Sequence, residues 1–193
     1  SPFLEERDES RTLREEADLA AELGFAATYV ARGPITGRPA VGYADQAIFH
    51  PLRYLLGLAR QIEAGGSFVR ERAEVGEVLD DPHAVVVNGE TIACRDVIIA
   101  THVPLAGTRG IVGATLFQTK LYPYSSYVVG ARVGADAPPA GLYSDLSDPY
   151  YFLRVHDDAG GRYAIFGGND HKTGQESDPE SCFTSLERDL GRI

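Results

Sequence analysis

Several residue types are scarce in this sequence of 193 residues. It has no methionine, no tryptophan and only two cysteines, Cys94 and Cys182, which lie far apart and form no CxxC pair. This spacing excludes a disulfide framework and a cysteine-based zinc site. We therefore expect two reduced thiols in a protein of the cytoplasm.

Basic residues and long apolar runs are scarce as well. The chain has 18 lysines and arginines against 28 aspartates and glutamates, a net charge of −10, and no basic patch offsets it. Such a surface repels phosphate backbones and anionic lipid headgroups. No apolar stretch reaches the roughly 20 residues that span a bilayer. We therefore expect no nucleic-acid and no membrane partner, whereas the hydrophobic content of 44% is enough for a packed core.

Three segments have the spacing of amphipathic helices. Ser10 is a candidate N-cap for a helix whose apolar face carries Leu13, Ala17, Ala20 and Leu23. Pro51 suits the first position of a second helix over 51–64, with apolar residues Leu52, Leu55, Leu56, Ala59 and Ile62. A third helix is predicted within a C-terminal helical segment, 171–193, from Phe183, Leu186 and Leu190.

Short strands are predicted between these helices. A meander over 75–94 contains an Asn88-Gly89 hairpin turn. Residues 96–101 are apolar throughout their middle, which predicts a strand buried on both faces, as in a parallel sheet covered by helices. After Pro104 the sequence alternates and is rich in tyrosine, which favours antiparallel strands. The predicted fold class is therefore α/β (α+β), with a mostly antiparallel sheet in the second half.

Four stretches, taken in order, carry a resemblance to a known family. They are AVGYADQAIFHPLRYLLGLARQIEAGG, DVIIATHVPL, TLFQTKLYPYSSYVVGARV and YYFLRVHDDAGGRYAIFGGNDHKTG. Together they resemble the FAD-dependent amino-acid oxidase family, and within it the branch that carries a C-terminal Rieske iron–sulfur domain. The resemblance implies FAD as cofactor and a [2Fe-2S] Rieske cluster outside this chain.

The resemblance also implies a division into lobes. Residues 40–104, with 164–170 returning to them, would form part of a flavin-binding three-layer lobe. Residues 10–40 and 105–163 would form the substrate-domain lobe, a mostly antiparallel sheet. The expected activity of the parent protein is transfer of a hydride from a C–N or C–H bond of a small substrate, with electrons passed on through the Rieske centre.

Matching positions imply roles for individual residues. The backbone at Val75 would meet the adenine of FAD, and Ala100, Thr101 and His102 would run beside the dinucleotide. The turn at His50 and Pro51 would approach the isoalloxazine ring, and the chain would return to the cofactor at Gly167 and Gly168. A helix N-terminus at Pro51 offers N–H groups and a partial positive charge, and a glycine pair lets backbone approach a planar ring.

Four side chains are the candidates for chemistry at this site. His50 and His171 would act at the flavin edge, and Arg154 and Tyr124 would orient the substrate. The forked guanidinium of Arg154 suits a substrate carboxylate, although a salt bridge at the rim of the sheet explains it as well. A metal site is not expected, because the histidines lack HxH or HExxH spacing.

The sequence departs from the family pattern in two respects. It contains no GxGxxG, the turn that holds the pyrophosphate of a dinucleotide, and it lacks the paired Cys-His motifs of a Rieske domain. We therefore expect an internal fragment that is inactive alone. The alternative from another class is a non-catalytic binding domain that uses its tyrosine-rich sheet as a protein interface.

Overall fold

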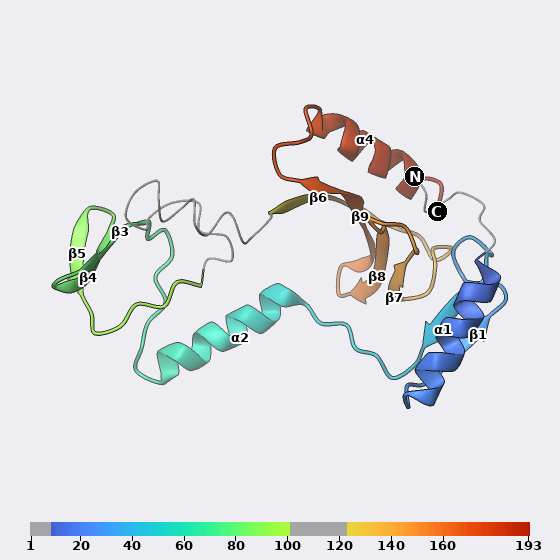
Figure 1. Ribbon diagram of the computed structural model, residues 1–193, viewed down its shortest axis with the longest axis horizontal. Coiled ribbons are helices and arrows are strands. Elements are labelled where there is room, and N and C mark those ends of the chain that lie inside the picture. The colour runs from blue at the N-terminus through green and yellow to red at the C-terminus, as the bar shows by residue number, and fades with distance from the viewer. Residues whose placement is uncertain (1–8, 101–122) are drawn as a thin grey trace. The chain divides into compact units, whose positions relative to one another are not determined.

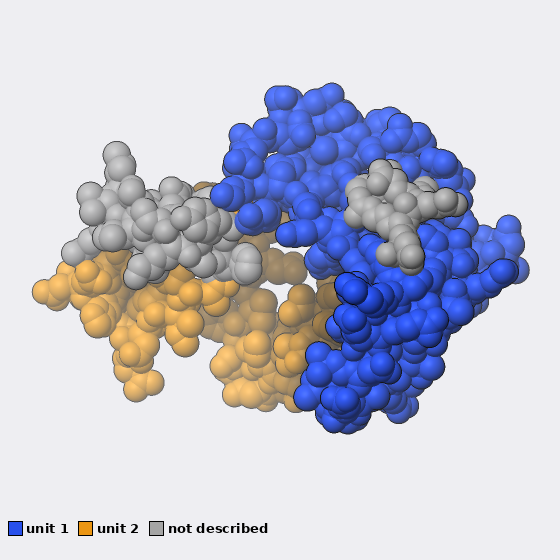
Figure 2. Space-filling model, turned by 45° about the vertical axis from the view of Figure 1, so that its right-hand side comes forward, with its two compact units in different colours: residues 1–48, 124–193 blue, residues 49–123 orange. Residues whose placement is uncertain are grey.

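Helices and antiparallel sheets make up the part of the chain that the computed structural model describes, residues 9–100 and 123–193 (Figure 1). The chain divides into two compact units, residues 1–48 with 124–193 and residues 49–123 (Figure 2). We call them unit 1 and unit 2. The mixed α/β class predicted from the sequence is confirmed.

A four-stranded antiparallel sheet organises unit 1. Its strands lie in the order β6 (Tyr124–Arg132), β9 (Gly161–Lys172), β8 (Phe152–Asp158) and β7 (Gly141–Ser144). Because side chains alternate along a strand, one face collects the apolar residues. Leu153, Val155 and Phe166 on this inner face are fully buried.

Helix α4 (Pro179–Leu190) packs on that inner face through Cys182 and Leu186. Pro179 occupies its first turn, and the carboxylate of Asp178 caps it by accepting the Ser181 N–H at 3.2 Å. Within the predicted helical segment 171–193, the helix itself begins only at Pro179, and His171 and Lys172 belong to the end of β9.

The remainder of unit 1 is helix α1 (Ser10–Glu22) and a hairpin of β1 (Ala27–Val30) and β2 (Ala40–Tyr43). The predicted apolar face of α1 is confirmed at Leu13, Ala17 and Ala20, which are buried, whereas Leu23 is 68% exposed. Gly24 ends the helix with φ +90°, a conformation that glycine adopts without strain.

Unit 2 contains α2 (Pro51–Ala64) and a meander of β3 (Val75–Asp80), β4 (His83–Val87) and β5 (Glu90–Ala93). The predicted Asn88-Gly89 hairpin is confirmed: both residues have positive φ, 49° and 85°, as a type I′ turn requires. The apolar face of α2 is not buried, and Leu52 and Leu55 are 60% and 58% exposed.

The predicted buried strand at 96–101 is wrong over its described part. Residues 96–100 form no strand, and Ile98 is 90% exposed. A strand buried on both faces needs paired neighbours and covering helices, and no strand among residues 9–100 and 123–193 pairs with this segment. The sheet of unit 2 ends at Ala93 instead.

Among the described helices, none is long and apolar enough to cross a membrane.

Candidate functional site

The face of the four-stranded sheet opposite α4, which we call the outer face, carries Arg154. Strand register sets three rows across it. Arg154 lies between Leu142 and Ile165, and Ile165 is opposite Gly130. The neighbouring row on one side consists of Val128, Gly167 and Phe152. The neighbouring row on the other side consists of Arg132, Tyr163 and His156. A cationic side chain thus lies between an apolar row and a polar row.

A hollow of about 270 Å³ opens on this face, and its lining includes Ile165, the residue that pairs with Arg154. Its floor includes Gly130, where an added Cβ would meet only the Ala164 carbonyl oxygen, at 3.9 Å. Ile165, His156 and Tyr163 surround it. The missing side chain at Gly130 therefore creates room for a small group over the row that contains Arg154.

The charged groups at the far edge of the hollow are engaged in holding the turn between β8 and β9. Arg132 donates to the Tyr163 hydroxyl at 3.3 Å and to the Gly160 carbonyl oxygen. Asp158 accepts the Gly160 N–H at 2.6 Å. These contacts give Arg132 and Asp158 structural roles in the turn between β8 and β9.

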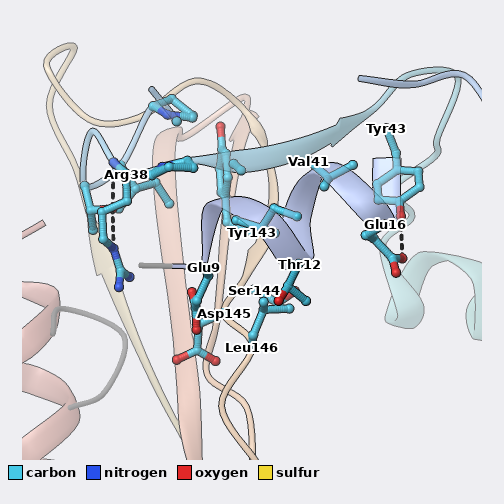
Figure 3. A pocket seen from close by; sticks show the side chains of 17 residues that line it. Glu9, Thr12, Glu16, Arg38, Val41, Tyr43, Tyr143, Ser144, Asp145 and Leu146 are labelled. Carbon is cyan, nitrogen blue, oxygen red and sulfur yellow. Dashed lines mark hydrogen bonds between the residues drawn. The ribbon is translucent and has the colours of Figure 1, made fainter. Parts of the chain in front are cut away.

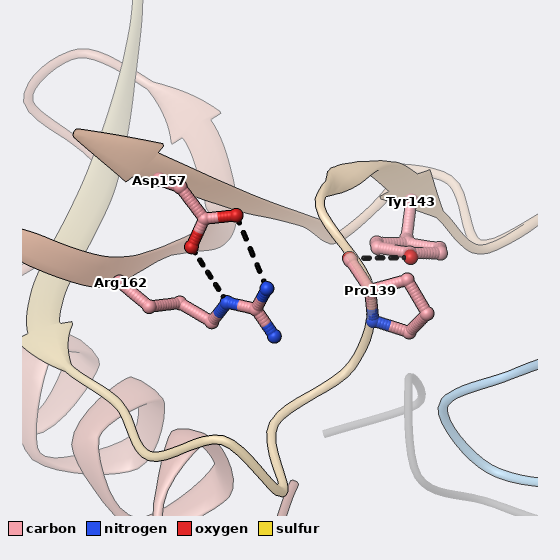
Figure 4. Close-up of polar contacts among 4 residues, drawn as sticks. All are labelled: Pro139, Tyr143, Asp157 and Arg162. Atoms are coloured by element: carbon pink, nitrogen blue, oxygen red, sulfur yellow. Dashed lines mark hydrogen bonds and ion pairs between the residues drawn. The ribbon is translucent and has the colours of Figure 1, made fainter.

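Asp157 and Arg162 form a bidentate ion pair between neighbouring strands (Figure 4). The Arg162 Nε lies 2.7 Å from Oδ1 of Asp157, and its second nitrogen lies 3.1 Å from Oδ2. The hydrogen bond from Arg162 lowers the pKa of Asp157 below its usual 3.8. In the same region the Tyr143 hydroxyl donates to the Pro139 carbonyl oxygen at 2.7 Å (Figure 4). Both contacts fix strands that carry the outer face.

No group of three or more His, Cys, Asp or Glu side chains in the described ranges is arranged to hold a metal ion.

Planar rings lie against Gly167 and Gly168, but they are the protein's own. A Cβ at Gly167 would come within 2.5 Å of the Phe152 ring, and one at Gly168 within 2.3 Å of the Tyr151 ring. Both glycines are buried. The pair is therefore required for packing inside the sheet, and its predicted contact with the cofactor stays a prediction.

His171 lies on the inner side of the sheet, at the end of β9. Its ring stacks on Tyr127, with centroids 5.5 Å apart, and Tyr127 belongs to the buried core. Because the carbonyl oxygen of Asn169 can only accept, the His171 Nδ1 at 3.1 Å from it is the donor. Arg154 lies between the buried Leu153 and Val155 on β8 and so points to the opposite face.

Tyr124 is also separate from Arg154. It begins β6, pairs with Lys172 and is 61% exposed. Arg154 shares its row with Gly130, and the stretch of β6 from Tyr124 to Gly130 is roughly 20 Å long at about 3.3 Å per residue. One small substrate therefore does not touch Arg154, Tyr124 and His171 together in unit 1.

The remaining predicted residues lie in unit 2. His50 caps α2, because its Nδ1 accepts the Arg53 N–H at 3.4 Å, and Pro51 follows in the first turn. Val75 begins β3 and is 50% exposed, and Ala100 lies in an irregular segment. Thr101 and His102 lie outside the described residues. The cofactor contacts predicted for all of these positions stay predictions.

Gly130, Ile165 and Tyr163 are not among the site residues predicted from the sequence. Alternation along β6 and β9 is visible in the sequence, but it does not say which residue of one strand lies opposite which residue of the next. The rows around Arg154 depend on that register.

Comparison with known proteins gives two matches. A family model described as FAD dependent oxidoreductase matches residues 3–190. YhfW of Bacillus subtilis (strain 168), which is named as a Rieske 2Fe-2S iron–sulfur protein, is 29% identical over 144 residues. The match covers 74% of this chain and 27% of that relative, so the chain spans about a quarter of the relative's length. No solved structure matches the chain.

Proposed function

Because the chain belongs to the FAD-dependent oxidoreductase family, we propose that it is part of an enzyme that takes a hydride from a C–N or C–H bond of a small substrate. The family match over residues 3–190 is the observation that carries this proposal. FAD, when bound, supplies the hydride acceptor, and the protein supplies binding and orientation.

The described residues do not form a complete cradle for FAD. The glycine pair at 167–168 is filled by the rings of Phe152 and Tyr151, and the N-terminus of α2 already receives its cap from His50. We therefore assign no cofactor step to these residues. The part of the function that this chain supplies in our proposal is the substrate-holding sheet.

Arg154 is the side chain that we propose for orienting the substrate. A guanidinium offers several N–H donors in a fixed fork that matches both oxygens of a carboxylate. The hollow over Gly130 is lined by Ile165, which pairs with Arg154, and Ile165 and Leu142 provide apolar contacts in the same row. A small carboxylic acid with a short side chain fits this combination.

We also propose that the parent protein passes electrons to a [2Fe-2S] cluster outside this chain. The support is the name of the Bacillus relative, which names it as a Rieske 2Fe-2S iron–sulfur protein. That relative is about four times as long as the matched segment. The cluster would be held by parts of the protein beyond these residues.

A binding role without catalysis is the second candidate. Leu142 and Val128 on the outer face are 65% and 47% exposed, which also suits a protein interface. The two candidates differ in a simple observation. A flavoprotein is yellow when purified at full length, whereas an interface domain is colourless and self-associates.

The role of Arg154 is tested with the full-length protein and butanoate, compared with the neutral butanamide. Charge-assisted hydrogen bonds contribute about 1.5–3 kcal/mol, so Arg154→Gln should weaken butanoate binding by about 10- to 150-fold and leave butanamide binding unchanged. Arg154→Lys should recover part of the loss. Arg11→Gln, at a side chain that is 90% exposed, is the matched control.

The proposed role of Arg154 fails if Arg154→Gln binds both probes as the unaltered protein does. The oxidoreductase proposal itself fails if the full-length protein is colourless and does not take up added FAD.

A further inference from the structure

A second cavity of unit 1 lies between α1, the loop after β1, strand β2 and the end of β7 (Figure 3). Its volume is about 390 Å³. Sites for small molecules have volumes of roughly 300–1,000 Å³. The cavity is therefore large enough for a small ligand, and it shares no residue with the rows around Arg154.

The walls of the cavity are largely apolar and fixed. Leu13 is one of the buried residues of α1, and Val41 of β2 is half-buried. Ile35 and Tyr143 pack against the core of the four-stranded sheet. Because these side chains are held by neighbouring elements, a ligand does not have to order them on binding.

Two carboxylates line this space, Glu9 at the N-cap of α1 and Glu16 within the helix. Glu9 and Glu16 are seven positions apart, about two helical turns, and thus lie on the same side of α1 (Figure 3). Glu16 accepts a hydrogen bond from the Tyr43 hydroxyl at 2.9 Å. Within the described residues, neither glutamate forms an ion pair with a lysine or arginine.

Two further charged groups line the cavity. Asp145 is engaged in its own turn, since it accepts the N–H groups of Ser147 and Tyr151 at 3.2 and 2.8 Å. Arg38 donates from Nε to the Thr36 hydroxyl at 3.0 Å. Among the lining residues that the structure describes, three carboxylates face one guanidinium, a net negative charge that favours cations and disfavours anions.

We propose that this cavity binds a small organic ammonium ion with a short apolar body. The ammonium N–H groups would donate to Glu9 or Glu16, and the apolar part would contact Leu13, Ile35 and Val41. The inference depends on the geometry of unit 1 alone and not on the proposed function, so either can fail without the other.

Calorimetric titration of the full-length protein with butylammonium tests this site. An exposed ion pair contributes about 0.2–1 kcal/mol, or about 1.4- to 5-fold in affinity. The double variant Glu9→Gln with Glu16→Gln should therefore weaken butylammonium binding by about 2- to 25-fold. Arg38→Gln should tighten it by about 1.4- to 5-fold, because a repelling charge is removed. Opposite signs at residues of one cavity are not expected from a general loss of structure.

The matched control is Asp18→Asn with Glu22→Gln, which removes two negative charges from α1 at exposed positions outside the cavity. It should leave the affinity unchanged. Val41→Phe, which fills the cavity, should abolish binding without affecting butanoate binding that depends on Arg154. The proposal is overturned if butylammonium shows no saturable binding, or if 1-butanol or butanoate binds the cavity equally well. It is also overturned if the control double variant weakens butylammonium binding as much as Glu9→Gln with Glu16→Gln does.

Discussion

Replacing Gly168 by alanine tests whether the glycine pair of β9 serves packing inside unit 1. A Cβ at this position would lie 2.3 Å from Cδ1, 2.6 Å from Cε1 and 2.9 Å from Cγ of Tyr151. All three distances are shorter than a carbon–carbon contact allows, so either the backbone of β9 or the Tyr151 ring must move.

Tyr151 cannot move without losing other contacts. Its hydroxyl donates to Oδ1 of Asn169 at 2.6 Å, its N–H donates to Asp145 at 2.8 Å, and its ring stacks on Phe166 with centroids 6.1 Å apart. Burial, and then the nearby Asp145 charge, raise the pKa of Tyr151, which keeps its hydroxyl protonated as a donor. The hydroxyl and the stacking on Phe166 therefore fix the ring, and the bond to Asp145 fixes the backbone that carries it.

The expected loss follows from these contacts. Overpacking a filled core costs about 1–3 kcal/mol, and the hydrogen bond to Asn169 contributes about 0.5–1.5 kcal/mol. We expect Gly168→Ala to lower the free energy of unfolding by about 2–4 kcal/mol. Because the chain has no tryptophan, urea unfolding followed by far-UV circular dichroism is the suitable assay.

Gly130→Ala is the matched control in the same sheet. Its Cβ would meet nothing closer than the Ala164 carbonyl oxygen at 3.9 Å, so we expect a change within about 0.5 kcal/mol. Equal stability of the two variants would refute the packing argument and leave the glycine pair without a structural explanation.

Two further predictions concern His50 and Asp157. His50→Ala should destabilise α2 by about 0.5 kcal/mol, because it removes the acceptor for the Arg53 N–H, whereas His50→Ser keeps an N-cap acceptor. The flavin absorption spectrum of the two full-length variants tests the other predicted role of His50. If both spectra are unchanged, the imidazole does not act at the flavin edge. Since the pKa of Asp157 is lowered in the folded state, its pair with Arg162 stabilises the protein above the ordinary pKa near 3.8 and this contribution disappears as the pH falls through the lowered value. The stability difference between the unaltered protein and Asp157→Asn should accordingly be present at pH 7 and vanish in acid, and a difference independent of pH would contradict the assignment.

The arrangement of the predicted site residues changes how their roles can be combined. Arg154 and His171 lie on neighbouring strands but on opposite faces, because His171 stacks on the buried Tyr127 while Arg154 alternates with the buried Leu153. A substrate held by Arg154 on the outer face is therefore separated from His171 by the sheet itself. Variants of these two residues should act independently.

The sequence by itself determined the local elements of this protein. The spacing of Leu13, Ala17 and Ala20 fixed a helical face, Pro51 marked a helix start, and Asn88-Gly89 specified a hairpin turn, because each depends on interactions between residues close together in the chain. The family resemblance required only the order of such segments.

Only the tertiary structure decided which residues share a face. The alternation of side chains is interrupted in β9 at Asn169, which has φ +57°, and in β6 by the irregular pairing between Ser125 and Tyr127. Counting along the sequence therefore does not say on which face of the sheet His171 lies. The partners of Gly167 and Gly168, the row around Arg154 and the failure of 96–100 to form a buried strand all depend on segments distant in the chain. Side-chain alternation is a local property, whereas strand register and burial depend on what lies opposite.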